Sequence, residues 1–313
     1  MQVYDYKNKA ELGKLKLEIS CSAKKSVIIL SPCRSGSTAL LNAFVMAGWD
    51  GIFQPVKTAL RRHFVQDNTP VRINASGALF AIKESLGPYN PAEIYYDPLR
   101  VLQEKGLTTP ETHLVVLLRK PEDCLLSWIK GFGRSHIPDF RPTLFSDAYA
   151  ATLEAYYNAV EKSIPVSAIC CQDLTNVNAL SALMVEIGEP FRREMTDWTQ
   201  SSKYQENEFG FEKPVEPEIF RVKGLLDSVR FGVGLARTSQ TAHNVTSEIS
   251  RETSDVANLP RARETYEAFR MLRFDFEHST RLAFKAPYLA GVSKASVEKK
   301  AGGEKRIAGQ DWP

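Results

Sequence analysis

The stretch Val27-Ile-Ile-Leu-Ser-Pro-Cys-Arg-Ser-Gly-Ser-Thr38 decides the fold class. Its first four residues are apolar and predict a buried strand, and a turn rich in Ser, Pro and Gly follows them. An apolar pattern of helical period then runs from Thr38 to Met46. A strand that leads through such a turn into a helix is typical of a β-α-β architecture, in which parallel strands are buried between helices.

Short apolar runs recur along the chain in the same pattern. Three more of them predict strands, over residues 79–82, 113–118 and 166–171. Helices are expected to begin near Pro121 and to cover residues 180–187 and 261–274. The sequence therefore predicts an α/β fold, a three-layer sandwich with a central, mostly parallel sheet flanked by helices.

The same survey predicts how the chain is divided. We expect an N-terminal extension over residues 1–24, one large domain over 25–284 and a flexible basic tail over 285–313. Residues 198–258 are polar, rich in Ser and Thr, and only weakly periodic. We expect this segment to supply substrate-facing loops and short helices.

Charge and cysteine usage narrow the classes of function. The net charge of +3 lies in the tail, which contains six Lys/Arg and three Asp/Glu. The rest of the chain contains 34 residues of each sign. A neutral body argues against a nucleic-acid partner. The five cysteines form no CxxC pair, and the N-terminus has no continuous apolar stretch. Free thiols, no membrane association and a cytoplasmic location are therefore expected.

The turn at residues 31–38 is the first candidate anion site. A turn at the carboxyl end of a parallel strand leaves the first N–H groups of the following helix pointing into one concavity, which suits a phosphate. Ser37 and Thr38 add hydroxyl donors, and Arg34 adds a charged fork that matches phosphate oxygens. The plainer alternative is a helix with serine caps and an incidental arginine.

A second candidate anion site begins where the strand at 113–118 ends. Arg119 leaves the sheet at its carboxyl edge, and Ser127 falls on the helix that follows, with Pro121 and Asp123 between them. Both side chains are expected to face a ligand in the crevice above the sheet. The alternative is that Arg119 pairs with Asp123 one helical turn away.

The two motifs together resemble the nucleotide-binding motifs of PAPS-dependent sulfotransferases, in the Arg-Ser-Gly-Ser-Thr version of bacterial and carbohydrate members. (PAPS is 3′-phosphoadenosine-5′-phosphosulfate.) A third similarity, over residues 166–191, extends the resemblance to about residues 25–195, although Cys171 and Gln172 depart from the family's Tyr-Glu. The resemblance implies a P-loop NTPase-like sulfotransferase fold, PAPS as cofactor, adenosine 3′,5′-bisphosphate as product, and no metal.

The resemblance also assigns the nucleotide contacts. It implies that the turn holds the 5′-phosphosulfate through Arg34, Ser35, Gly36, Ser37 and Thr38. It implies that Arg119 and Ser127 hold the 3′-phosphate. A further nucleotide loop has only a faint candidate, at residues 221–224.

Catalytic residues are expected at the end of the strand at 79–82. The resemblance implies that Lys83 contacts the transferring group, together with Arg34. Without the resemblance, a lysine that ends a strand is equally well explained as a solvated strand terminus. Gln54 stands where some members of the family carry a glutamate that acts as the catalytic base, and an amide cannot take up the acceptor's proton. Glu84 is the first candidate for the base, with His136 and His63 as alternatives.

The predicted function is transfer of the sulfuryl group of PAPS to a hydroxyl or amine of a small-molecule acceptor such as a secondary metabolite. Two alternatives stay open. A small-molecule kinase differs by the GxxxxGK[ST] loop, since Ser31 and Ser37 replace its first Gly and its Lys. A catalytically inactive nucleotide-binding domain gains weight from Gln54 and Cys171.

Overall fold

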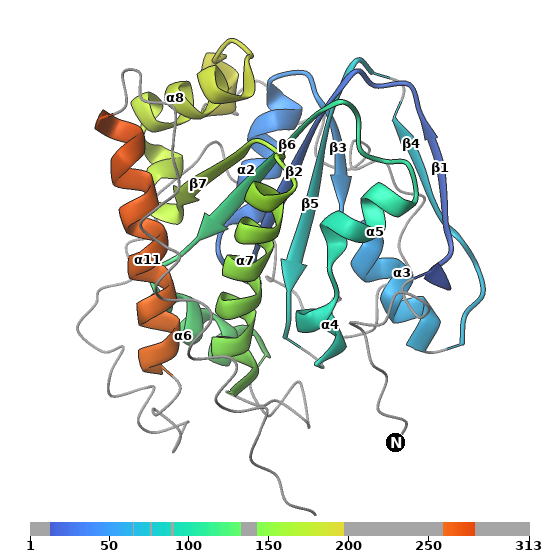
Figure 1. Cartoon of the computed structure of the whole chain (residues 1–313), viewed down its shortest axis with the longest axis horizontal. Helices are drawn as coiled ribbons and strands as arrows, with labels where there is room; N and C mark the ends of the chain where they lie inside the picture. The colour runs from blue at the N-terminus through green and yellow to red at the C-terminus, as the bar shows by residue number, and fades with distance from the viewer. Residues whose placement is uncertain are drawn as a thin grey trace, which may run out of the picture. The chain divides into compact units, whose positions relative to one another are not determined.

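Five parallel strands form the central sheet of the computed structural model, which describes residues 13–64, 66–75, 77–88, 91–132, 143–196 and 259–278 (Figure 1). The strands are β2 (Lys25–Pro32), β3 (Asp50–Phe53), β5 (Leu79–Leu86), β6 (Glu111–Leu118) and β7 (Val166–Cys170). Their order is β3-β5-β2-β6-β7, and each neighbouring pair is parallel. The predicted central parallel sheet is confirmed.

Helices cover both faces of this sheet, which confirms the predicted three-layer α/β fold (Figure 1). They are α2 (Ser37–Met46), α3 (Pro55–Phe64), α4 (Ala92–Tyr95), α5 (Pro98–Glu104), α6 (Pro121–Phe132), α7 (Thr143–Glu161), α8 (Val177–Ile187) and α11 (Leu259–His278). Helices α2 and α8 pack on one face, and the other helices pack on the opposite face.

The alternation of side chains along β2 creates the two cores. Val27 and Ile29 pack against α2 and α8, whereas Ile28 and Leu30 pack on the opposite face. All four are fully buried, because helices cover the strand on both sides. The continuous apolar run in the sequence is therefore explained by burial on both faces.

The strand order reverses at β2, next to β6. From β2 the chain runs to β3 and β5 on one side, and then crosses to β6 and β7 on the other. In open parallel sheets, ligands bind outside the carboxyl ends of the strands at the point where the order reverses. Both candidate anion motifs follow strands that end at this point, because β2 and β6 are neighbours.

A separate two-stranded sheet flanks the main one. It pairs β1 (Leu17–Cys21) with β4 (Val71–Ala75) in parallel. Strand β1 lies within the segment predicted to be an N-terminal extension, and the neighbouring Leu15 and Ile73 are buried in the core. The sequence did not predict β1, β3 or β4, because each is short and mixes polar with apolar residues.

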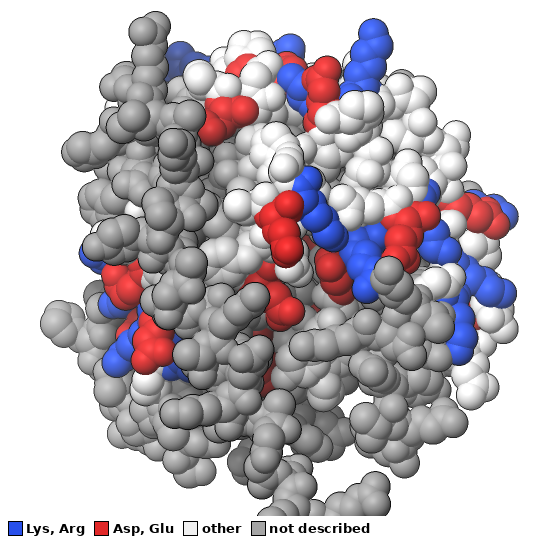
Figure 2. Space-filling view, viewed as in Figure 1, with Lys and Arg blue, Asp and Glu red and all other residues white. Residues whose placement is uncertain are grey.

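Acidic and basic side chains lie next to one another on the described part of the face seen in Figure 2. Ion pairs between exposed residues, such as Arg72 with Glu18 at 2.9 Å, account for such mixing. Within the described ranges, no helix is both long and apolar enough to cross a bilayer. The predicted substrate-facing segment 198–258 and tail 285–313 lie outside the described residues.

Candidate active site

The turn between β2 and α2, called here the anion loop, spans Cys33–Gly36. Arg34 and Gly36 adopt left-handed backbone conformations, with φ of 68° and 93°. The first helical hydrogen bond runs from Leu40 N to Gly36 O at 3.1 Å, so the N–H groups that precede Leu40 in α2 have no helical carbonyl to bond. The loop therefore presents the start of a helix to the crevice, as an anion site requires.

Glycine is needed at the last position of the anion loop for two reasons. The positive φ of Gly36 is costly for residues with a Cβ. A Cβ there would also lie 3.0 Å from Cys171 Sγ and 3.2 Å from Leu174. The turn after β7 therefore packs tightly against the loop, which places Cys171 beside the candidate site.

The two predicted anion motifs touch each other. Arg34 Nε donates a hydrogen bond to Ser127 Oγ at 2.9 Å. Arg119 Nη1 donates to the carbonyl oxygen of Arg34, with a longer separation of 3.4 Å. The residues predicted to hold opposite ends of one nucleotide thus belong to a single polar cluster at the carboxyl ends of β2 and β6.

Arg119 keeps its charge available. It makes no ion pair with any residue in the described part of the chain, and the alternative pairing with Asp123 is absent from the ion pairs found there. Its backbone is fixed because Tyr149 Oη donates to Arg119 O at 2.6 Å. A guanidinium on an anchored backbone, with no carboxylate partner among the described residues, is suited to binding an anion.

Lys83 lies near the carboxyl end of β5, on the face of the sheet that carries α2. Its ammonium group is 4.2 Å from the centre of the Phe53 ring and 3.4 Å from Ser85 Oγ. The side chain is buried, and it makes no ion pair with a described residue. Burial, with a smaller contribution from the nearby Lys57, lowers the pKa of Lys83 to about 7.

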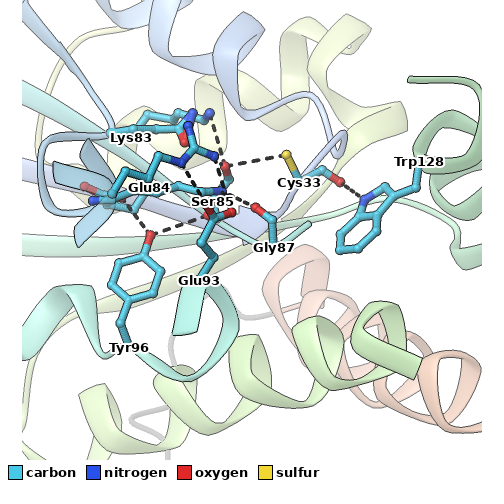
Figure 3. Close-up of polar contacts among 11 residues, drawn as sticks. Cys33, Lys83, Glu84, Ser85, Gly87, Glu93, Tyr96 and Trp128 are labelled. Carbon is cyan, nitrogen blue, oxygen red and sulfur yellow. Dashed lines mark hydrogen bonds and ion pairs between the residues drawn. The ribbon is translucent and has the colours of Figure 1, made fainter. Parts of the chain in front are cut away.

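Ser85 connects Lys83 to two neighbouring segments. Ser85 Oγ donates to Gln54 Oε1 at 3.3 Å and lies 3.8 Å from Cys33 Sγ, a contact seen in Figure 3. Gln54 is buried and has a φ of 53°, an uncommon conformation for a residue other than glycine. Such strain is concentrated at functional sites, which makes Gln54 a candidate for contact with the acceptor.

Glu84 points to the opposite face of the sheet from Lys83, because neighbouring residues in a strand alternate. Its carboxylate accepts hydrogen bonds from Val56 N at 2.7 Å, Lys57 N at 3.4 Å and Tyr96 Oη at 2.8 Å (Figure 3). The side chain is fully buried, and burial raises its pKa to about 7. This geometry favours a role in holding the start of α3 over contact with an acceptor.

A buried charge network lies under the same helix. Lys57 Nζ is 3.4 Å from Glu93 and donates to the carbonyl oxygens of Ser85 and Gly87. Arg61 Nε reaches the other oxygen of Glu93 at 2.7 Å. Burial lowers the pKa of Lys57, and the Glu93 carboxylate opposes this shift. The network anchors α3 and α4 to the end of β5.

Of the two predicted histidines, the structure describes His63. His63 lies in the last turn of α3, eight residues after Pro55, which is about 12 Å along the helix from its start. His136 and the faint candidate at 221–224 lie outside the described residues.

Sequence reasoning missed Ser85 and Lys57. Ser85 had a usable signal, since it is two positions after Lys83 and must share its side of the strand. Lys57 had no local signal, because nothing in the sequence places its partner Glu93 opposite it.

Comparison with known proteins yields distant structural similarity only. No family model matches the chain, and no curated protein matches it. The sulfotransferase domain from the curacin biosynthetic pathway is 14% identical, with a TM-score of 0.41 over 74% of this chain and 99% of that one. Mouse sulfotransferase SULT7A1 complexed with PAP is 12% identical, with a TM-score of 0.37 over 83% and 94%.

The sulfotransferase domain of the Synechococcus PCC 7002 olefin synthase is 14% identical, with a TM-score of 0.38 over 79% of this chain and 96% of that one. Likenesses this distant transfer no residue's role. We therefore infer the function from the arrangement of this chain's own side chains.

Proposed function

We propose that the protein is a sulfotransferase that moves the sulfuryl group of PAPS to a hydroxyl or amine of a small-molecule acceptor. The observation that carries the proposal is the contact between the two anion motifs, from Arg34 to Ser127 and from Arg119 to Arg34 O. A ligand held by both motifs needs two phosphate groups on one compact scaffold. A 3′-phosphorylated adenosine with a 5′-phosphosulfate meets this need.

We assign each nucleotide contact to a side chain or N–H group of the polar cluster formed by the two anion motifs. Helix-start N–H groups, the hydroxyls of Ser37 and Thr38, and Arg34 bind the 5′-phosphosulfate. Arg119 and Ser127 bind the 3′-phosphate. Arg119 supports this assignment because it has no ion-pair partner among the described residues, so the 3′-phosphate would be its first counter-charge.

The transfer is an in-line displacement. The acceptor oxygen or nitrogen bonds to sulfur while the bond between sulfur and the 5′-phosphate oxygen breaks, and negative charge grows on the leaving and equatorial oxygens. Lys83 supplies positive charge for these oxygens, since an anion bound beside it favours its protonated form. The acceptor's proton leaves with a base or with solvent.

The contacts of Glu84 favour a structural role over that of the base. Glu84 was the first candidate, but three donors already occupy its carboxylate, so we propose that it positions α3 and with it Gln54. His136 stays a predicted base outside the described residues. Gln54 and Ser85 then orient the acceptor through hydrogen bonds, without taking its proton.

Ligand-dependent melting tests the proposal against the kinase alternative. Adenosine 3′,5′-bisphosphate without metal is expected to raise the melting temperature of the full chain, because a ligand that binds only the native state stabilises it. ATP with magnesium is expected to have little effect. The opposite pattern would assign the protein to the kinases.

Transfer of ³⁵S-labelled sulfate from PAPS tests the inactive-domain alternative. Incubation with a panel of phenols, alcohols and amines is expected to label at least one class, and a chelator is expected to leave the rate unchanged. Binding of the bisphosphate without transfer to any acceptor would identify a nucleotide-binding domain instead of an enzyme.

A further inference from the structure

The anion loop is held from one side through its carbonyl groups. Cys33 O accepts hydrogen bonds from Trp128 Nε1 at 2.5 Å and from Cys124 Sγ at 3.3 Å, and Cys33 N donates to Leu86 O at 2.9 Å. Figure 3 shows Cys33 between Ser85 and Trp128. Cys33, where the chain enters the loop, is thus fixed at both its N–H and its C=O, which belong to two successive peptide groups.

Trp128 is itself fixed. The ring is fully buried and packs edge-on against Phe145, with centroids 5.2 Å apart. Gly87, at the end of β5, has a φ of 77° and lies so close that a Cβ there would collide with the indole. These contacts hold the ring where its indole N–H donates to Cys33 O in the loop.

The direction of these carbonyls determines the direction of the loop's N–H groups. In a trans peptide, the C=O and the N–H of the next residue point to opposite sides. Because Cys33 O points to Trp128, the N–H of Arg34 points away from α6. Arg34 O faces Arg119, so the N–H of Ser35 points away from that side chain in turn.

We propose that Trp128 is a positioning residue that presets the anion loop, so that its backbone N–H groups face the 5′-phosphosulfate before the nucleotide arrives. This inference rests on the proposed function. The neighbouring Ser127 belongs to the 3′-phosphate site, so one turn of α6 serves both ends of the nucleotide. The ring of Trp128 alone would be enough for core packing. The positioning role needs its indole N–H, which donates to Cys33 O.

Trp128→Phe removes the donor and keeps most of the ring. Trp49→Phe is the matched control, because Trp49 is also buried and packs edge-on against Phe44, beyond the far end of α2. Calorimetry on the full chain compares adenosine 3′,5′-bisphosphate with adenosine 3′-monophosphate, and the affinity ratio of the two ligands isolates the 5′-phosphate. Melting temperatures of both variants report the loss of packing.

We expect Trp128→Phe to weaken the bisphosphate about tenfold, as loss of one well-made hydrogen bond does, and to leave the 3′-monophosphate within about twofold. Trp49→Phe is expected to leave the ratio unchanged. A ratio that stays at the wild-type value in Trp128→Phe overturns the positioning role, because a merely structural effect weakens both ligands alike. Failure of the wild type to bind the bisphosphate overturns the proposed function, and the inference with it.

Discussion

At one end of the site Arg119 carries a charge with no ion-pair partner among the described residues, whereas at the other end Lys57 and Glu93 are both buried and paired at 3.4 Å. We call the first the loop end, comprising the anion loop, Arg119 and Ser127. We call the second the α3 end, comprising Lys57, Arg61, Glu84, Glu93 and Tyr96. The α3 end satisfies its own charges, so it acts as scaffold, and the loop end leaves charge for a ligand.

This comparison predicts that substitutions at the two ends fail in different ways. Changes at the α3 end are expected to reduce stability, because an uncompensated charge is left in the core. Changes at the loop end are expected to reduce nucleotide affinity with little loss of stability. Lys83 shares a property with each end: it is buried like the α3 end, and like Arg119 at the loop end it makes no ion pair with a described residue.

The largest expected effect comes from Glu93→Ala. It removes the carboxylate that both Lys57 and Arg61 contact, and breaking a buried pair in this way costs about 3–5 kcal/mol. The melting temperature is expected to fall by about 10 °C. Glu18→Ala, which breaks an exposed pair with Arg72, is the control and costs less than about 1 kcal/mol. Equal losses in the two variants would contradict a scaffold role for the α3 end.

Arg119→Ala tests the loop end. We expect calorimetry to show that adenosine 3′,5′-bisphosphate loses about 2–4 kcal/mol of binding free energy, because a charged, forked donor is lost. The melting temperature of the ligand-free protein is expected to stay near that of the wild type. Arg119→Lys keeps the charge but loses the forked pair of donors, so its affinity for the bisphosphate should lie between that of the wild type and that of Arg119→Ala. Unchanged affinity in Arg119→Ala would mean that other residues hold the 3′-phosphate.

Lys83→Met tests whether a buried, unpaired cation costs stability. The pKa of Lys83 is lowered to about 7 in the folded protein, against 10.5 ordinarily, so the wild type gains stability as pH rises from 7 to 10.5. The variant is therefore expected to melt about 5 °C above the wild type near pH 7, with the difference shrinking toward pH 10. Exposed Lys16→Met is the control. A difference that does not change with pH would contradict the lowered pKa.

The same comparison explains what the sequence could predict. The loop end was predictable because its residues lie in two continuous motifs, each at a strand end, and parallel strands bring their carboxyl ends together. The α3 end was not, because Lys57 and Glu93 are 36 positions apart in the numbering and meet only through the path of β5 and α4. Long-range pairing of buried charges leaves no local pattern.

Glu84 and Ser85 show how strand geometry separates neighbouring residues. It was predicted as the base because it follows Lys83 directly, yet strand alternation places consecutive side chains on opposite faces. Ser85 is the residue that shares a face with Lys83, and it is the one that contacts Gln54 and Cys33. Strand geometry, applied before proximity in sequence, would have favoured Ser85 for the site.

The smallest expected effect, and the sharpest contrast, comes from Ser127→Ala. Loss of its hydroxyl is expected to cost about 1 kcal/mol of nucleotide affinity, because one hydrogen bond to the 3′-phosphate is removed. Unlike Trp128→Phe, it should weaken adenosine 3′-monophosphate and the 3′,5′-bisphosphate equally, because Arg34 keeps its charge for the 5′-phosphate when the acceptor Ser127 Oγ is removed, so the affinity ratio stays at the wild-type value. Ser181→Ala on α8 controls for the substitution itself. If Ser127→Ala changes the ratio instead, this turn of α6 does not separate the two phosphates, and the loop end is one undivided anion site.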